Sequence, residues 1–354
     1  MVTSIVSKQV AGRITAVGGS ETGVEAVDPV DTAAFSDLAG LYGPDSEAWR
    51  LNREAVLLLG AGPRALLMQI AHPLVAEGVD QHSDFRIDPW GRLQATLRSY
   101  LTIVYGSAPT ARGEIRRLGR LHRAIVGPVR DPAAAEATGA ATYSARDPAL
   151  SLWVHATLVD STIVAHDAWI EPLSRTRREA FYAETRPIGR AFGVPERLLP
   201  PDLAAFEAYL AAMLGLDGPV HPTPTSSELA RTILRPPLAP LAPMMAPHLA
   251  RYVRRTARAG LADRLAQTLA RVPVAAYDWT VWPAVALLPA GLREEFGIAW
   301  GPDRRLVAAW LAAGFRGWRR VLPPAWRQMP LALAADRRMA AADAGIVAYR
   351  APSR

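Results

Sequence analysis

One histidine of this chain is surrounded by apolar residues, in the stretch LSLWVHATLVDS at 150–161. On a helix, Leu152, His155 and Val159 share one stripe, together with Thr162. A histidine on an apolar face is commonly a core residue whose ring nitrogens are satisfied. Haem iron is held in the same way, because one imidazole binds the metal while apolar side chains cover the macrocycle. From the residues alone, both interpretations of His155 are open.

A second histidine lies among arginines, in RRLGRLHRAIVG. His122 is flanked within two helical turns by four guanidinium groups, those of Arg116, Arg117, Arg120 and Arg123. The arginine fork matches paired carboxylate oxygens, so this segment could receive an anionic group such as a haem propionate. The alternative is a solvated basic helix face with an incidental histidine.

Two further histidines lie in QIAHPLVAEGVDQHSDF. His72 precedes Pro73, which disfavours helical angles at His72, so the helix breaks there. Broken helices that carry histidines often line cofactor pockets, although they also occur as plain kinks. His82-Ser83-Asp84 has the H-x-D spacing of the non-haem iron facial triad, but that motif usually lies on strands, whereas this chain is helical in pattern.

The composition excludes several kinds of site. The chain has no cysteine, so disulfides, thiolate metal sites and cysteine nucleophiles are absent, and any metal is held by nitrogen or oxygen. The net charge of +7 comes almost wholly from arginine, spread over every segment without a concentrated stripe. Binding to nucleic acid is therefore not expected. The motifs H-E-x-x-H and G-x-S-x-G, typical of zinc proteases and serine hydrolases, are also missing.

Apolar spacing near 3.6 residues recurs between proline and glycine positions, which predicts an all-α fold. The expected helices lie near 33–41, 47–60, 64–77, 92–105, 110–126, 132–143, 148–168, 174–192, 201–214, 225–233, 246–270, 274–287, 303–321 and 329–345. The proline-dense segment 235–247 cannot be a regular helix, and it is either a hinge or a crossing loop. The amphipathic segment that follows it suits a surface helix, and membrane contact there is a second interpretation.

Gly60, Gly62 and Ala65 match the G-x-G-x-x-A fingerprint of dinucleotide-binding proteins. That fingerprint requires a preceding strand and a second strand about 20 residues on, and the sequence there does not read as a strand. With Pro63 inside the turn and a helical pattern over 47–59, a helix–turn–helix corner is the favoured interpretation. A nicotinamide-dependent oxidoreductase is thus a less favoured alternative.

The first 30 residues lack a basic start followed by a continuous apolar stretch, so no secretory signal is expected. The longest apolar runs are far shorter than the roughly 20 residues of a membrane span. We expect a flexible arm over 1–32, one helical domain over 33–354, and a cytoplasmic protein.

Several stretches, in this order, resemble one known family: AHPLVAEGVDQHSDF, DPWGRLQATLRSYLTIVYG, RLHRAIVG, YSARDPALSLWVHATLVDS and LLPAGLREEFGIAW. It is the oxygenase family that contains the bacterial rubber oxygenase (latex-clearing protein) and the fungal enzyme that cleaves a farnesyl chain during mycophenolic acid synthesis. The resemblance covers roughly residues 47–300. It implies a helical fold that encloses a b-type haem, with the iron held by a histidine.

Carried onto this sequence, the resemblance makes His155 the proximal iron ligand, with Leu152 and Val159 against the haem. His122 or His72 would orient oxygen or relay a proton. The arginines assigned to the propionates are Arg116, Arg120 and Arg123. Which of Thr157 and Asp160 reaches the imidazole of His155 is left open.

The function implied is oxygen transfer from dioxygen to an apolar, isoprenoid-like substrate at haem b, with oxidative cleavage of a C=C bond as the best-precedented outcome. Two departures bear on this mechanism. The family's distal lysine is replaced by His122 and arginines, and its glutamate base has no counterpart near 98–108. A haem-binding or sensing protein without turnover is therefore the alternative from a different class.

Overall fold

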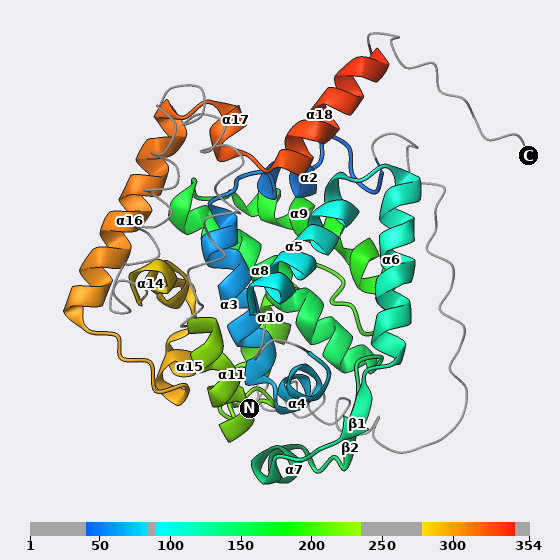
Figure 1. The fold of residues 1–354 in the computed structure, drawn as a ribbon, viewed down its shortest axis with the longest axis vertical. Coiled ribbons are helices and arrows are strands. Elements are labelled where there is room, and N and C mark those ends of the chain that lie inside the picture. The colour runs from blue at the N-terminus through cyan, green and yellow to red at the C-terminus, as the bar shows by residue number, and fades with distance from the viewer. Residues whose placement is uncertain (1–39, 84–88, 235–277, 344–354) are drawn as a thin grey trace, which may run out of the picture.

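The computed structural model describes residues 40–83, 89–234 and 278–343. Within these residues the fold is all-α, as the sequence predicts, and a single two-stranded antiparallel hairpin accompanies the helices (Figure 1). The expected arm over 1–32, the proline-dense segment 235–247 and the expected helix over 246–270 lie outside the described residues.

The helices, in chain order, are α2 (Glu47–Leu51), α3 (Leu57–Ala71), α4 (Pro73–His82), α5 (Pro89–Tyr105), α6 (Ala108–Arg123), α7 (Pro132–Thr138), α8 (Pro148–Trp169), α9 (Arg175–Ala191), α10 (Leu203–Met213), α11 (Pro224–Leu234), α14 (Asp278–Leu287), α15 (Ala290–Glu295), α16 (Pro302–Val321), α17 (Pro324–Arg327) and α18 (Pro330–Asp343). The hairpin joins β1 (Val126–Pro128) to β2 (Thr142–Ser144).

Helix α8 is the central element, and α3 packs along it (Figure 1). It begins where Asp147 accepts a hydrogen bond from the Ala149 amide and Pro148 occupies the first turn. Among the described residues it is the one helix long and apolar enough to cross a membrane by length and composition, but 61% of the tested window is buried inside the protein. Its apolar character is therefore explained by its place in the core.

The other helices surround this pair, and α6 lies on one side of the molecule while α16 lies on the opposite side (Figure 1). The largest fully buried side chains come from α2, α8, α5 and α9, and include Trp49, Trp153, Tyr105 and Tyr182. Buried side chains of the neighbouring helices thus pack around α8, and this close packing restricts the orientation of the buried side chains that α8 carries.

The expected corner at Gly60–Pro63 is wrong, because α3 is helical from Leu57 through both residues to Ala71. Gly60 faces α8 instead, where a Cβ atom would overlap the indole of Trp169, so the glycine permits close helix packing. Helix on both sides of Gly60 also excludes the strand that a dinucleotide-binding turn needs.

The expected helix over 47–60 is also wrong, because α2 ends at Leu51 and α3 starts only at Leu57. The residues between them are held by partners distant in sequence. Glu54 forms an isolated β-bridge with Gln328, and the Asn52 side chain accepts a hydrogen bond from the hydroxyl of Tyr100.

Two further expected helices are shorter than predicted. The one over 64–77 breaks at His72, as the His72-Pro73 pair indicates. The one over 132–143 ends at Gly139, whose φ of 64° closes α7, and the chain then pairs as β2 with β1.

Candidate functional site

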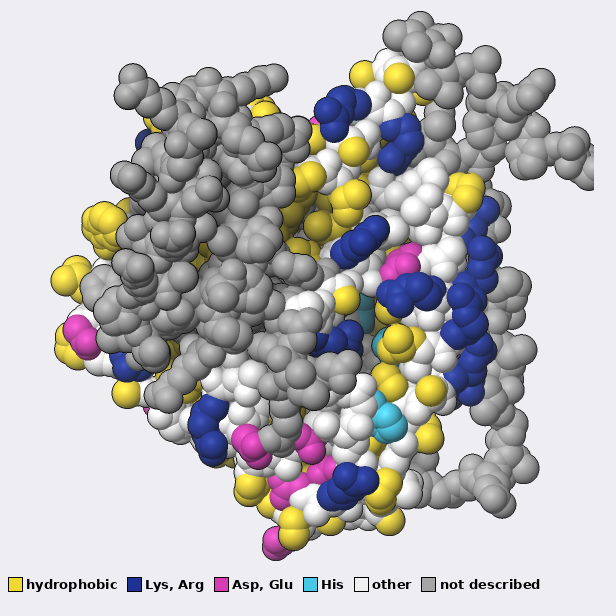
Figure 2. Space-filling model, viewed as in Figure 1, with side chains coloured by type: hydrophobic (Ala, Val, Ile, Leu, Met, Phe, Trp, Pro, Cys, Tyr) yellow, Lys and Arg dark blue, Asp and Glu magenta, His cyan; other side chains and the backbone are white. Residues whose placement is uncertain are grey.

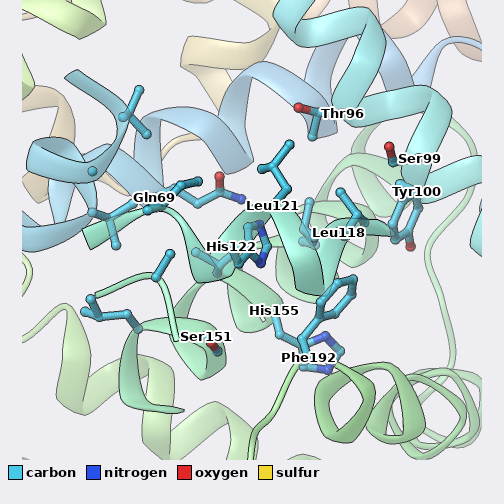
Figure 3. A pocket seen from close by; sticks show the side chains of 18 of the residues that line it. Gln69, Thr96, Ser99, Tyr100, Leu118, Leu121, His122, Ser151, His155 and Phe192 are labelled. Atoms are coloured by element: carbon cyan, nitrogen blue, oxygen red, sulfur yellow. The ribbon is translucent and has the colours of Figure 1, made fainter. Parts of the chain in front are cut away.

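A cavity of about 350 Å³ opens between α3, α4, α5, α6, α8 and α9 (Figure 3). Its size lies within the range of ~300–1,000 Å³ typical of small-molecule sites. Most of its lining side chains are aliphatic, and no Asp or Glu occurs among the described residues that line it. The cavity is therefore suited to an apolar ligand.

One face of α8 forms the floor of this cavity. The lining residues follow the spacing of a single helical face, and they are Leu150, Ser151, Val154, His155, Leu158 and Val159. Of the three α8 residues predicted for the site, His155 and Val159 line the cavity. Leu152 does not line it, and packs with Val194 and Leu199 in a separate apolar cluster.

His155 is a buried histidine with an unpaired ring nitrogen. The residue is 5% exposed, and its Nε2 atom is buried without a hydrogen-bond partner among the described residues. Burial lowers the pKa of His155 to about 4, so the imidazole is neutral at pH 7 and one of its two ring nitrogens has a free lone pair. An unpaired buried ring nitrogen is costly unless something binds it.

The backbone of α9 approaches the imidazole at Gly189. A Cβ atom at this position would lie 3.3 Å from Cδ2 and 3.5 Å from Nε2 of His155, and 2.8 Å from a methyl group of Leu199. Glycine therefore leaves just enough room for the ring edge, and the packing holds the imidazole in one orientation.

Neither of the two candidate partners on α8 reaches the ring of His155. Asp160 forms an ion pair with Arg64 at 2.7 Å, which ties α8 to α3. The hydroxyl of Thr157 donates to the Val154 carbonyl and accepts from the amide of Gln69 at 3.1 Å. The imidazole is positioned by packing rather than by these polar groups.

His122 enters the cavity from α6, and both His122 and His155 project into it (Figure 3). The His122 ring lies 6.2 Å from the ring of Phe192, centroid to centroid. Burial, with the nearby charge of Arg92, lowers the pKa of His122. His122 is thus a neutral, half-buried donor or acceptor within the cavity.

Two arginines line the cavity, and neither is among those predicted for the propionates. The Nε atom of Arg92 donates to the Ser83 hydroxyl at 3.1 Å. Arg117 donates to the Ser99 hydroxyl at 2.9 Å and forms an ion pair with Glu114 at 2.6 Å. Burial and the charge of Arg117 lower the pKa of Arg92, although part of Arg92 is exposed to solvent. Two guanidinium groups therefore border the cavity, and that of Arg117 already has a carboxylate partner.

Arg116, Arg120 and Arg123, which the sequence suggested for the propionates, are exposed and do not line the cavity. These three arginines share the face of α6 that points away from the cavity. Consecutive residues of a helix are rotated by about 100° about its axis, so Arg116 and Arg117 point in different directions although they are adjacent.

His72 does not line the cavity either. Its Nδ1 atom accepts a hydrogen bond from the Leu74 amide at 3.3 Å and so caps α4, while burial lowers its pKa to about 4. His82 is at the cavity edge, with Nε2 3.0 Å from the Val126 carbonyl oxygen. Asp84, its partner in the H-x-D pattern, lies outside the described residues, and in the described part of the chain no three His, Asp or Glu side chains gather as metal ligands.

Sequence reasoning missed Tyr143, which comes from β2 and lines the cavity. Its hydroxyl is buried without a hydrogen-bond partner among the described residues, so it is a second unpaired polar atom at this site. The only signal in the sequence was its place in YSARDP, just before α8.

Comparison with known proteins gives a match that covers most of the chain. The family described as "ER-bound oxygenase mpaB/B'/Rubber oxygenase, catalytic domain" matches residues 49–323. The chain is also 29% identical over 165 residues to the uncharacterized proteins Mb2261 of Mycobacterium bovis and Rv2237 of Mycobacterium tuberculosis. Each match covers 44% of this chain and 61% of the relative, so the chain spans about three fifths of their length.

No solved structure matches this chain. The family match includes every described helix and strand that lines the cavity. The chain belongs to the family of mpaB and rubber oxygenase catalytic domains.

Proposed function

We propose that this protein is a haem b-dependent oxygenase that acts on an apolar, alkene-bearing substrate. The observation that carries the proposal is the unpaired Nε2 atom of His155, buried in an apolar cavity of about 350 Å³. Membership in an oxygenase family supports the reaction class. The haem and the substrate are our inference.

The residues present fit a haem. Among the described residues that line the cavity, His155 is the histidine with a buried ring nitrogen that lacks a hydrogen-bond partner, and Gly189 lies beside it without a side chain. The lining is mainly aliphatic, which suits a macrocycle. Arg92 and Arg117 would hold the two propionates, with Arg117 shared between a propionate and Glu114. When bound, the haem iron would supply the oxygen chemistry, which the side chains cannot.

The chain's own groups have four tasks in this proposal. His155 would hold the iron through Nε2, and its low pKa keeps the imidazole neutral, so that one ring nitrogen has a lone pair to donate. The aliphatic lining excludes water and holds an apolar chain. His122 and Tyr143 each place a polar atom in the cavity, where they can donate a hydrogen bond or carry a proton.

The overall reaction proposed is cleavage of one C=C bond by one molecule of dioxygen to give two carbonyl groups. Both oxygen atoms of dioxygen enter the products, so the balance needs no external reductant. No carboxylate lines the described cavity, so His122 is the titratable group that we propose as proton carrier in place of a glutamate.

The test measures oxygen uptake by the haem-loaded protein with isoprenoid alkenes and with their saturated analogues. We expect uptake with the alkenes alone, and carbonyl products that carry ¹⁸O from labelled dioxygen at both new positions. Haem binding without uptake by any alkene would contradict the oxygenase proposal and favour the haem-binding or sensing alternative. A protein that binds no haem would contradict both.

The assignment of the propionates has its own test. Arg117→Gln should weaken binding of haem, measured by absorbance titration, and leave binding of haem dimethyl ester unchanged, because the ester has no carboxylates. Arg116→Gln, one position along α6 and exposed, is the matched control and should change neither. Equal effects on haem and its ester would contradict the assignment.

A further inference from the structure

Three arginines that the proposed function leaves unused form a ridge on the outer face of α6. Arg116, Arg120 and Arg123, the basic ridge, are spaced by four and three residues and are all exposed. Figure 2 shows basic side chains in a column along this edge of the molecule. None of the three forms an ion pair or a side-chain hydrogen bond within the described residues, so their charge is not neutralised there.

The ridge lies on the face of α6 opposite the one that lines the cavity, and Leu121 is exposed at the margin of the cavity. Leu121, between two ridge residues in sequence, lines the cavity and is nevertheless 41% exposed. Val126, on β1 just beyond α6, is 51% exposed. Leu121 therefore brings apolar surface from the cavity to the outside, on the same helix as three arginines that have no ion pair among the described residues.

We propose that the basic ridge, with Leu121 and Val126, docks this protein on an anionic phospholipid bilayer. Arginines attract the lipid phosphates, while exposed aliphatic side chains enter the boundary of the hydrocarbon. This proposal rests on the proposed function, because an apolar substrate dissolved in a bilayer would meet the cavity at its apolar margin.

A bilayer fits this surface better than a single-stranded nucleic acid does. Non-specific binding of single-stranded nucleic acid relies on exposed aromatic side chains that stack with bases. The large exposed aromatic side chains in the described residues are Trp310, Trp318 and Trp326. Trp310 and Trp318 lie on α16, on the opposite side of the molecule from α6, and Trp326 lies on α17, which follows α16 (Figure 1).

The first test is co-sedimentation of the full chain with vesicles of phosphatidylglycerol and phosphatidylcholine at low and high salt. We expect binding to the anionic vesicles that falls with salt and is weak on phosphatidylcholine alone. Each arginine near such a surface contributes about fivefold, so replacing the three ridge arginines by glutamine should weaken partitioning on the order of 100-fold.

The matched control replaces three exposed arginines of α16, Arg305, Arg316 and Arg320, by glutamine. It removes the same charge from the opposite side of the molecule and should keep vesicle binding within about threefold of the parent. Helical circular dichroism confirms that both variants fold. Loss of binding in the α16 variant, but not in the ridge variant, would overturn the proposal in favour of the other face.

The second test uses the absence of cysteine in the chain. An environment-sensitive fluorophore is attached to the single cysteine of Val126→Cys. The control is the same label on Val321→Cys, because Val321 is on α16 and is 76% exposed. We expect a blue shift with anionic vesicles at position 126 and none at 321. No shift at 126, or a preference for RNA over vesicles, would refute membrane docking. Neither readout needs haem or turnover, so failure of the docking proposal would leave the oxygenase proposal unaffected.

Discussion

The fit of α9 against the proposed iron ligand can be tested with a single methyl group. In Gly189→Ala the new Cβ atom would lie 2.8 Å from Leu199 and 3.3 Å from the imidazole of His155. Leu199 is itself buried in an apolar cluster, so it has little room to move. Either the ring or α9 must therefore shift.

Two free-energy terms oppose each other in this variant. Alanine in place of glycine in a helix stabilises it by about 1 kcal/mol. Overpacking a close-packed site costs about 1–3 kcal/mol. We expect a net loss of about 1 kcal/mol in the free energy of unfolding, and about tenfold weaker haem binding because the imidazole is displaced.

The assays are urea unfolding of the apoprotein and absorbance titration with haem. Gly113→Ala on α6 is the matched control, because no atom lies within 4 Å of its added Cβ, and it should gain about 1 kcal/mol and bind haem normally. If Gly189→Ala is stabilised as much as this control and binds haem like the parent, the argument that α9 fixes the imidazole is refuted.

Three further predictions concern stability. Gly60→Ala should lower the free energy of unfolding in urea by at least about 2 kcal/mol, because the added Cβ overlaps Trp169. Gly317→Ala, with open space around the added Cβ, is the control and should raise it by about 1 kcal/mol. Equal effects would contradict the packing of α3 on α8. The pKa of His72 is about 4 in the folded protein and about 6.5 in the unfolded chain. The folded protein is therefore most stable above pH 6.5, and the free energy of unfolding falls by up to about 3 kcal/mol as the pH falls towards 4. His72→Asn keeps the helix cap and should reduce the slope of stability against pH in this window; an unchanged slope would show that His72 is not buried in its neutral form. Tyr143→Phe removes a buried hydroxyl without a described partner and should stabilise the apoprotein by about 1 kcal/mol; a loss of that size would mean that the hydroxyl is bonded.

The sequence was informative where function depends on one helix and its faces. Periodicity alone put His155 on an apolar stripe of α8, and the structure buries it there beside Val159. The break at His72 follows from Pro73, since the steric restriction before proline is local. Such features need no knowledge of distant segments.

The sequence was uninformative where the answer depends on how a helix is rotated or what packs on it. Arg116 and Arg117 are adjacent and chemically identical, yet only Arg117 lines the cavity. The break between α2 and α3 depends on the bridge from Glu54 to Gln328, which no local pattern reveals. The cytoplasmic location and the flexible arm over 1–32 stay predictions.

The central claim is that His155 holds haem iron. It is tested most directly by the visible absorption spectrum of the haem-reconstituted protein, beside His155→Ala and the control His72→Asn. We predict a Soret band in the parent and in His72→Asn, and a band that is lost or shifted in His155→Ala and restored towards the parent by added imidazole. A parent without a Soret band, or a His155→Ala spectrum identical to the parent's, would contradict the claim.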